Sequence, residues 1–286
     1  MLRGVIAAAV ALAVVTGMTA CGGPPAPRPA SYYLALGDSL SRGVQPDASG
    51  ASVETAQGYP NRVQSRLVAA HPGLKLVQLG CPGETTETMM HGGICRYQDG
   101  SQLAAAEAFL RAHRGHVMLV TIDIGANDPE SCGGQPSLKQ LASCVGEIPG
   151  AAANLSAILS AVRAAAGAGV RIVGMSYYLP ALAEWRNGLL GQEIARAAAR
   201  LAAGYNDLLH EAYAKAGVAV ADVFGAFGTT DFGDPETVPG FGPLPRNVAR
   251  ICQWTWECAP APRGPNQHAN AAGYQVIADA VLKVAG

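Results

Sequence analysis

Five short apolar, β-rich runs alternate with longer Ala/Leu/Arg-rich segments over most of the chain. Near-continuous hydrophobic runs of this length are typical of parallel strands that helices cover on both faces. The alternation therefore predicts a doubly wound α/β domain with right-handed crossovers. The predicted strands are Tyr32–Leu36, Leu74–Leu79, Val117–Ile124, Val170–Met175 and Val218–Val223. The predicted helices are Tyr59–Ala70, Gln102–His113, Ala151–Ala166, Leu190–Ala216 and Ala271–Val284.

Two longer segments, Gly125–Gly150 and Phe224–Asn270, show no strand or helix period. We expect both to be irregular. Long irregular segments in a compact domain tend to carry function.

The first 20 residues are typical of a secretory signal, with Arg3 followed by an Ala/Val/Leu run too short for a comfortable membrane span. Small residues lead into Cys21, as in a bacterial lipoprotein, so we expect cleavage before Cys21 and lipid on that cysteine. The alternative is an ordinary signal peptide cut near Ala20. Residues 21–30 are proline-rich and predict a semi-rigid tether. Residues 31–286 are then expected to form a single domain, anchored to the outer face of the bacterial cell membrane.

Six further cysteines follow, an even number behind a secretion signal, which predicts disulfides. They fall into three local pairs, so we expect the bonds Cys81–Cys95, Cys132–Cys144 and Cys252–Cys258. A zinc site is disfavoured because there is no Cys-x-x-Cys and no histidine at ligand spacing from a cysteine pair. We expect neither a metal nor a cofactor.

The charge is nearly balanced, with 20 Lys and Arg against 21 Asp and Glu, and the chain has no basic block. This composition argues against nucleic acid and other polyanionic partners. We expect a monomer that meets the membrane only through its lipid anchor.

Chemically useful residues stand where the predicted strands end. Ser39 follows the first strand in Gly37-Asp38-Ser39-Leu40-Ser41, and Gly83 follows the second in Pro82-Gly83-Glu84-Thr85. Asn127 follows the third in Gly125-Ala126-Asn127-Asp128, and His268 stands just before the last helix. Each alone is explained by a turn or a helix cap. Their order and types together resemble the SGNH (GDSL) hydrolase superfamily, of the secreted bacterial esterase and lipase type. The Gly-x-Ser-x-Gly elbow of α/β-hydrolases is absent.

The resemblance implies a three-layer α/β/α flavodoxin-like sandwich around a five-stranded parallel sheet. It also implies that Ser39 is the nucleophile and His268 its general base. The Ser39 and Gly83 amides and the Asn127 side chain would form the oxyanion hole. The expected reaction is carboxylic ester hydrolysis through an acyl-enzyme, on small-molecule or lipid esters. The alternatives are a glycan O-deacetylase and a non-catalytic ligand-binding lipoprotein that keeps the fold.

The sequence departs from the family three residues before the histidine, where Pro265 replaces the usual aspartate. A catalytic histidine needs an acceptor at Nδ1 to hold its tautomer. The first candidate is the Pro265 carbonyl, the second is the Asn266 side chain, and the third is Asp231 or Asp234. A neutral acceptor predicts a His268 pKa that is not raised.

Two aromatic stretches are candidates for walls of a substrate cleft. Trp254 and Trp256, inside the Cys252–Cys258 loop, would lie near the histidine unless they pack as core. Tyr177-Tyr178-Leu179-Pro180, after the fourth strand, would line the acyl side.

Overall fold

A five-stranded parallel sheet forms the centre of the fold, in the order β4-β1-β5-β6-β7. The computed structural model describes residues 1, 31–128, 137–144, 146 and 148–286. The five predicted strands are confirmed, each with a shift of one or two residues at one or both ends. The strands are β1 (Ser31–Gly37), β4 (Leu74–Gln78), β5 (Val117–Asp123), β6 (Arg171–Met175) and β7 (Ala219–Ala221).

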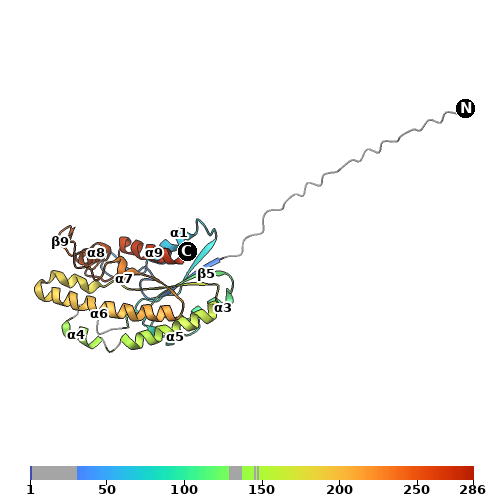
Figure 1. Ribbon diagram of the computed structural model, residues 1–286, viewed down its shortest axis with the longest axis horizontal. Helices are drawn as coiled ribbons and strands as arrows, with labels where there is room; N and C mark the ends of the chain where they lie inside the picture. The colour runs from blue at the N-terminus through green and yellow to red at the C-terminus, as the bar shows by residue number, and fades with distance from the viewer. Residues whose placement is uncertain (2–30, 129–136, 145, 147) are drawn as a thin grey trace.

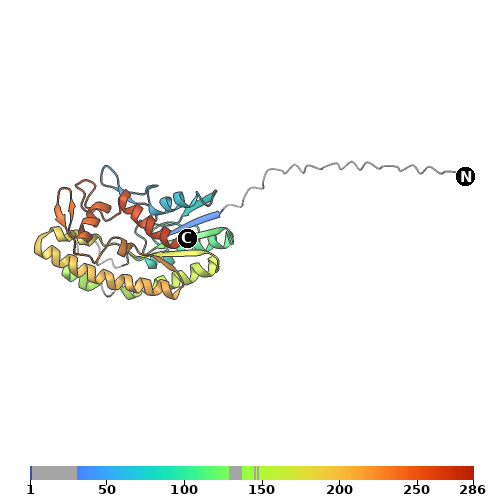
Figure 2. The same cartoon turned by 45° about the horizontal axis from the view of Figure 1, so that its top comes forward.

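Helices cover both faces of this sheet and make three layers (Figure 1). Helices α1 (Tyr59–Leu67) and α9 (Ala271–Ala285) pack together on one face. Helices α3 (Gln102–Ala112), α5 (Ile148–Ala166) and α6 (Gly188–Lys215) cover the other, as the turned view shows (Figure 2). The α/β/α sandwich predicted from the sequence is therefore confirmed. Because the central strands are buried on both sides, β1 and β5 are nearly continuous apolar runs.

Helix α5 is the one described helix that is long and apolar enough to span a membrane by length and composition. In the fold it packs between α3 and α6. Eight of its side chains are buried, which explains its apolar composition as that of a core helix.

The segments expected to be irregular contain short elements, so that prediction is wrong in part. Residues 224–270 include the hairpin β8 (Glu236–Val238) and β9 (Gly242–Leu244) and the helix α8 (Arg246–Trp254). Helix α8 begins after Pro245 and buries Val248, Ala249 and Ile251. The apolar period of α8 extends over only about two helical turns, and glycine and proline surround these short elements. The sequence pattern is therefore too short to be recognised. The remaining short elements are β2 (Gln45–Pro46), β3 (Ser52–Val53), α2 (Thr86–His91), α4 (Leu138–Cys144), the 3₁₀ helix η2 (Pro180–Arg186) and α7 (Val223–Ala226).

Two of the expected disulfides, Cys81–Cys95 and Cys252–Cys258, are confirmed. Cys132 lies outside the described residues, so its bond to Cys144 stays a prediction. Residues 2–30, with nearly all of the expected signal, Cys21 and the whole tether, also lie outside them.

Candidate active site

The loop that carries Ser39 leaves β1 through a turn that only glycine fits. Gly37 has a φ of +130°, and a Cβ there would lie 2.1 Å from the Asp123 carbonyl oxygen. Asp38 N donates to that carbonyl at 3.0 Å, and Ser41 N donates to Asp123 Oδ2 at 3.0 Å. Asp123, at the end of β5, therefore holds this loop in place through hydrogen bonds with two backbone N–H groups. Ser39 itself is 9% exposed and lies at the carboxyl end of the sheet.

Gly83 lies in a second loop, between β4 and α2. Its φ is +82°, a conformation that favours glycine. Cys81 N donates to Gly37 O at 2.9 Å, which ties this loop to the end of β1. Thr85 caps α2 by accepting from Thr88 N. The Gly83 amide is thus held between the end of β1 and the capped helix α2.

Asn127 follows β5 and contacts the Gly83 loop. Its Nδ2 donates to Glu84 O at 2.9 Å, and the amide has a second N–H for another acceptor. The neighbouring Asp128 accepts from Thr86 N at 2.9 Å and from the Thr86 hydroxyl. Asp128 therefore joins the loop after β5 to the start of α2.

His268 precedes α9, whose first turn is capped by Asn270 Oδ1. Asn266 Oδ1 lies 2.8 Å from His268 Nδ1 and accepts from His268 N at 3.0 Å. Asn266 Nδ2 donates to Ser52 Oγ at 3.2 Å, which leaves Oδ1 as the acceptor for the ring. Nδ1 therefore carries the proton, and Nε2, which has no hydrogen-bond partner in the described part of the chain, can act as a base.

The structure thus selects the second of the three expected partners for the histidine. Among the described residues, the Pro265 carbonyl forms no hydrogen bond with the ring, so the first expectation is wrong. The third is wrong because Asp231 and Asp234 each bind Arg246 at 2.7 Å. The amide of Asn266 reaches Nδ1 through a turn of only two residues.

Burial lowers the pKa of His268 from its usual 6.5 to about 4. A neutral partner does not offset this, because it favours the imidazolium less than a carboxylate does. The direction agrees with the expectation of an unraised pKa. His268 is consequently an unprotonated base at neutral pH.

Two buried carboxyl groups lie next to Ser39: Asp38 belongs to the same loop, and Asp123 ends β5. Asp123 Oδ1 accepts from the Tyr59 hydroxyl at 2.6 Å, and Asp38 Oδ1 accepts from Leu40 N at 2.9 Å. Asp38 Oδ2 has no hydrogen-bond partner among the described residues. Burial raises the pKa of both groups, that of Asp38 to about 7. Sequence reasoning missed Asp123, because it lies inside an apolar run with no motif of its own.

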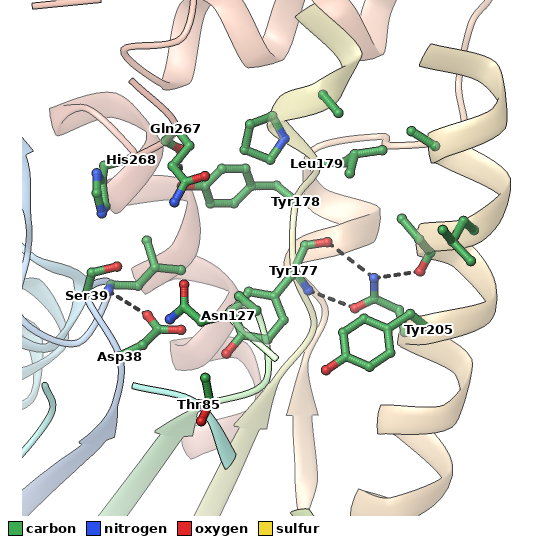
Figure 3. A pocket seen from close by; sticks show the side chains of 18 of the residues that line it. Asp38, Ser39, Thr85, Asn127, Tyr177, Tyr178, Leu179, Tyr205, Gln267 and His268 are labelled. Carbon is green, nitrogen blue, oxygen red and sulfur yellow. Dashed lines mark hydrogen bonds between the residues drawn. The ribbon is translucent and has the colours of Figure 1, made fainter. Parts of the chain in front are cut away.

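Ser39, Gly83, Asn127 and His268 all line one cavity of about 450 Å³. Figure 3 shows Ser39 and His268 on the same side of it, with Asn127 between Ser39 and Tyr177. Among the described residues, the Ser39 hydroxyl and the His268 ring share no hydrogen bond, which is common before substrate binds. The four residues singled out in the sequence are therefore brought together.

The rest of the cavity wall is largely apolar. Tyr177-Tyr178-Leu179-Pro180 line it as predicted, and α6 supplies Ala198, Leu201, Ala202 and Tyr205. Asn206 Oδ1 accepts from Tyr177 N at 2.8 Å and fixes this wall to α6 (Figure 3). The two tryptophans are not part of the lining, so their assignment as a cleft wall is wrong, and the stated alternative of core packing holds for Trp254. Trp256 does lie beside the histidine, because its backbone N donates to His268 O at 3.0 Å. Trp254 packs edge-on against Phe227, 5.1 Å between ring centroids.

No group of three or more His, Cys, Asp or Glu side chains among the described residues is placed to hold a metal ion.

The model of the GDSL-like lipase/acylhydrolase family matches residues 35–276, which include all four cavity residues. The chain belongs to this family. The superfamily resemblance read from the sequence is therefore confirmed, and family membership implies an ester hydrolase. The search of curated proteins found no match.

Solved structures share the fold of this GDSL-family protein. An extracellular lipase from Streptomyces rimosus superposes with a TM-score of 0.60 at 20% identity, over 89% of this chain and 100% of that one. An acetyl xylan esterase from Geobacillus stearothermophilus superposes with a TM-score of 0.51 at 19% identity, over 90% of this chain and 94% of that one. A lipase from a goat rumen metagenome superposes with a TM-score of 0.53 at 17% identity, over 90% of this chain and 97% of that one. At these identities the likeness shows the fold alone.

Proposed function

We propose that this protein is a carboxylic ester hydrolase in which Ser39 is the nucleophile and His268 the general base. The observation that carries the proposal is the common cavity. One cavity brings together a serine, a histidine with a free Nε2, a glycine amide and a side-chain amide, drawn from four separate segments. These are the parts that acyl transfer needs: a nucleophile, a base with an orienting partner, and donors for the oxyanion.

In the proposed reaction Ser39 Oγ attacks the ester carbonyl carbon while its proton passes to His268 Nε2. The carbonyl oxygen becomes an oxyanion that accepts from the Ser39 and Gly83 amides and from Asn127 Nδ2. The ester C–O bond then breaks, and the proton on Nε2 goes to the leaving alcohol. Water repeats the sequence on the acyl-enzyme and releases the acid. Asn266 keeps the Nδ1–H tautomer through both halves of the reaction.

The cavity wall supports an acyl group of short to medium length as the substrate's buried part. Leu179, Leu201 and the α6 alanines present an apolar surface that a hydrocarbon chain would bury. The polar side of the cavity, with Ser39 and His268, would take the ester group (Figure 3). We propose that p-nitrophenyl butyrate and hexanoate are hydrolysed faster than acetylated xylan.

A fluorophosphonate probe tests the proposal directly, because it phosphonylates only an activated serine. Wild-type protein should label, Ser39→Ala should not, and Ser156→Ala, which changes a solvent-facing serine of α5, should label normally. A folded wild-type protein that never labels would instead support a ligand-binding role. Release of acetate from acetylated xylan faster than from the aryl esters would favour the deacetylase alternative.

We further propose that the enzyme is secreted and carries lipid on Cys21. The signal-like residues 1–20 support this, as do two disulfides, which form in oxidising compartments. Mass spectrometry of the mature amino terminus tests it. A diacylglyceryl group on Cys21 is expected, and an unmodified terminus would overturn the anchor.

A further inference from the structure

Gln102, the first residue of α3, is fully buried and uses its whole side-chain amide on two loops of the site. Its Oε1 accepts from Gly37 N at 2.6 Å. Its Nε2 donates to Gly37 O and to Glu84 Oε2, each at 3.0 Å. Both partner residues are buried, Glu84 with 1% exposure. This amide does not line the cavity and so contacts no substrate.

The two partners of Gln102 stand next to the proposed oxyanion donors. Gly37 is two residues before Ser39, and Glu84 directly follows Gly83. The backbone oxygen of Glu84 also accepts from Asn127 Nδ2 at 2.9 Å. One side chain therefore connects, directly or through Glu84, the segments that supply all three donors.

The chain connection alone does not fix these donors relative to one another, because they come from loops after three different strands. A backbone bond joins the first two loops, from Cys81 N to Gly37 O at 2.9 Å, and it lies before Gly83. The Gln102 amide adds a second connection beyond Gly83. The glycine is therefore bracketed on both sides by links to the end of β1.

We propose that Gln102 is a positioning residue of the oxyanion hole, which sets the spacing between the Ser39 and Gly83 amides and Asn127. This inference rests on the proposed function. Only a side-chain amide offers an acceptor and two donors on one planar group. Methionine has nearly the same length and shape but none of these bonds. Glutamate keeps the acceptor for Gly37 N and loses the donors.

The test compares kcat, KM and inhibition by an alkyl boronic acid, whose adduct with Ser39 places an oxygen in the oxyanion hole. Gln102→Met should lower kcat roughly 10²-fold, because displacements of about 1 Å cost about that much. The KM of a p-nitrophenyl ester should stay within about 2-fold, and boronate inhibition should weaken in parallel with kcat. The parallel change identifies a transition-state effect. Gln102→Glu should be impaired at neutral pH and recover relative to wild type as the pH falls, because protonation restores a donor toward Glu84.

Asn247→Leu is the matched control. Asn247 is also fully buried, and its amide donates to Thr229 O at 3.0 Å, away from the cavity. It should lower the melting temperature about as much as Gln102→Met and leave kcat and boronate inhibition unchanged. If Gln102→Met behaves like this control, the positioning role is overturned while the esterase proposal stands. If wild-type protein neither hydrolyses esters nor binds the boronate, both proposals fail.

Discussion

Asn266 Oδ1 lies 2.8 Å from His268 Nδ1 and also accepts from the backbone N of the same histidine, at 3.0 Å. A neutral amide, two residues before the histidine, thus binds the ring nitrogen, whereas the aspartate usual in the family would stand three residues before it, at Pro265. An acceptor of this kind fixes the tautomer and the orientation of the ring. It provides no charge to stabilise the imidazolium that would form in the proposed reaction. Orientation and charge, which a carboxylate combines, are here separable by substitution.

Removing the Asn266 acceptor should show how much the orientation of the His268 ring contributes to kcat. Asn266→Ala should lower kcat by between about 10²- and 10⁴-fold, because the ring is then free to present the wrong tautomer. Measurement of kcat on p-nitrophenyl butyrate checks this, with Ser52→Ala as the control that removes only the outer bond to Asn266 Nδ2. Equal, small losses in both variants would show that the amide does not orient His268.

Adding a negative charge at position 266 should raise the pKa of His268. In Asn266→Asp one carboxylate oxygen would face Nδ1 and the Ser52 hydroxyl could donate to the other. The carboxylate favours the protonated ring, so the pKa of His268 should rise by about one unit or more. Nuclear magnetic resonance titration of the histidine, in a Ser39→Ala background, measures this pKa. An unchanged value would mean that the introduced carboxylate does not contact the ring.

The strands and their order along the chain could be predicted because they are buried on both faces and therefore nearly pure apolar runs. Ser39, Gly83, Asn127 and His268 could be named because each stands at a strand end or helix start in a recognisable motif. Gln102 could not be named as a contact of these loops, because its partners Gly37 and Glu84 are far away in sequence and glutamine is an ordinary residue at a helix start. The wall formed by α6 could not be assigned either. Only packing decides which of its many alanines face the cavity.

The lowered pKa of His268 predicts a broad active range toward acid. The base is neutral above about pH 4, so kcat/KM should stay level down to roughly that pH and then fall. The stability of the fold should also depend on the protonation of His268. The folded pKa lies below the unfolded value of 6.5, so the unfolded state binds the proton more readily between these two pH values. The contribution of His268 to the free energy of unfolding should therefore decrease as the pH falls from 6.5 toward 4. A pH–rate profile from about pH 3 to 8 checks the first point, because an acid limb near 6.5 would contradict the burial effect.

The raised pKa of Asp38 changes stability with pH in the direction opposite to that of His268. Its folded pKa is about 7 against an ordinary 3.8, so the folded state holds a proton that the unfolded state releases in this window. The stability that this group contributes is complete below about pH 4 and is lost as the pH rises through 7. An asparagine side chain does not titrate, so the Asp38→Asn variant should gain stability relative to wild type across that window. The amide oxygen of the variant can still accept from Leu40 N. Urea unfolding at about pH 4.5 and about pH 8 measures the difference, and a gap that does not widen with pH would refute it.

The α6 wall should set acyl-chain length. Ala202 is half-buried and lines the cavity, whereas the adjacent Ala203 is half-buried and does not. In Ala202→Phe the ring would occupy part of the 450 Å³ available to the acyl chain. The ratio of kcat/KM for p-nitrophenyl octanoate over acetate should fall about 10-fold or more, since each buried methylene contributes about 0.8 kcal/mol. Ala203→Phe adds the same volume outside the cavity and should leave the ratio unchanged. If both variants shift it equally, or neither does, the acyl chain does not bind along α6.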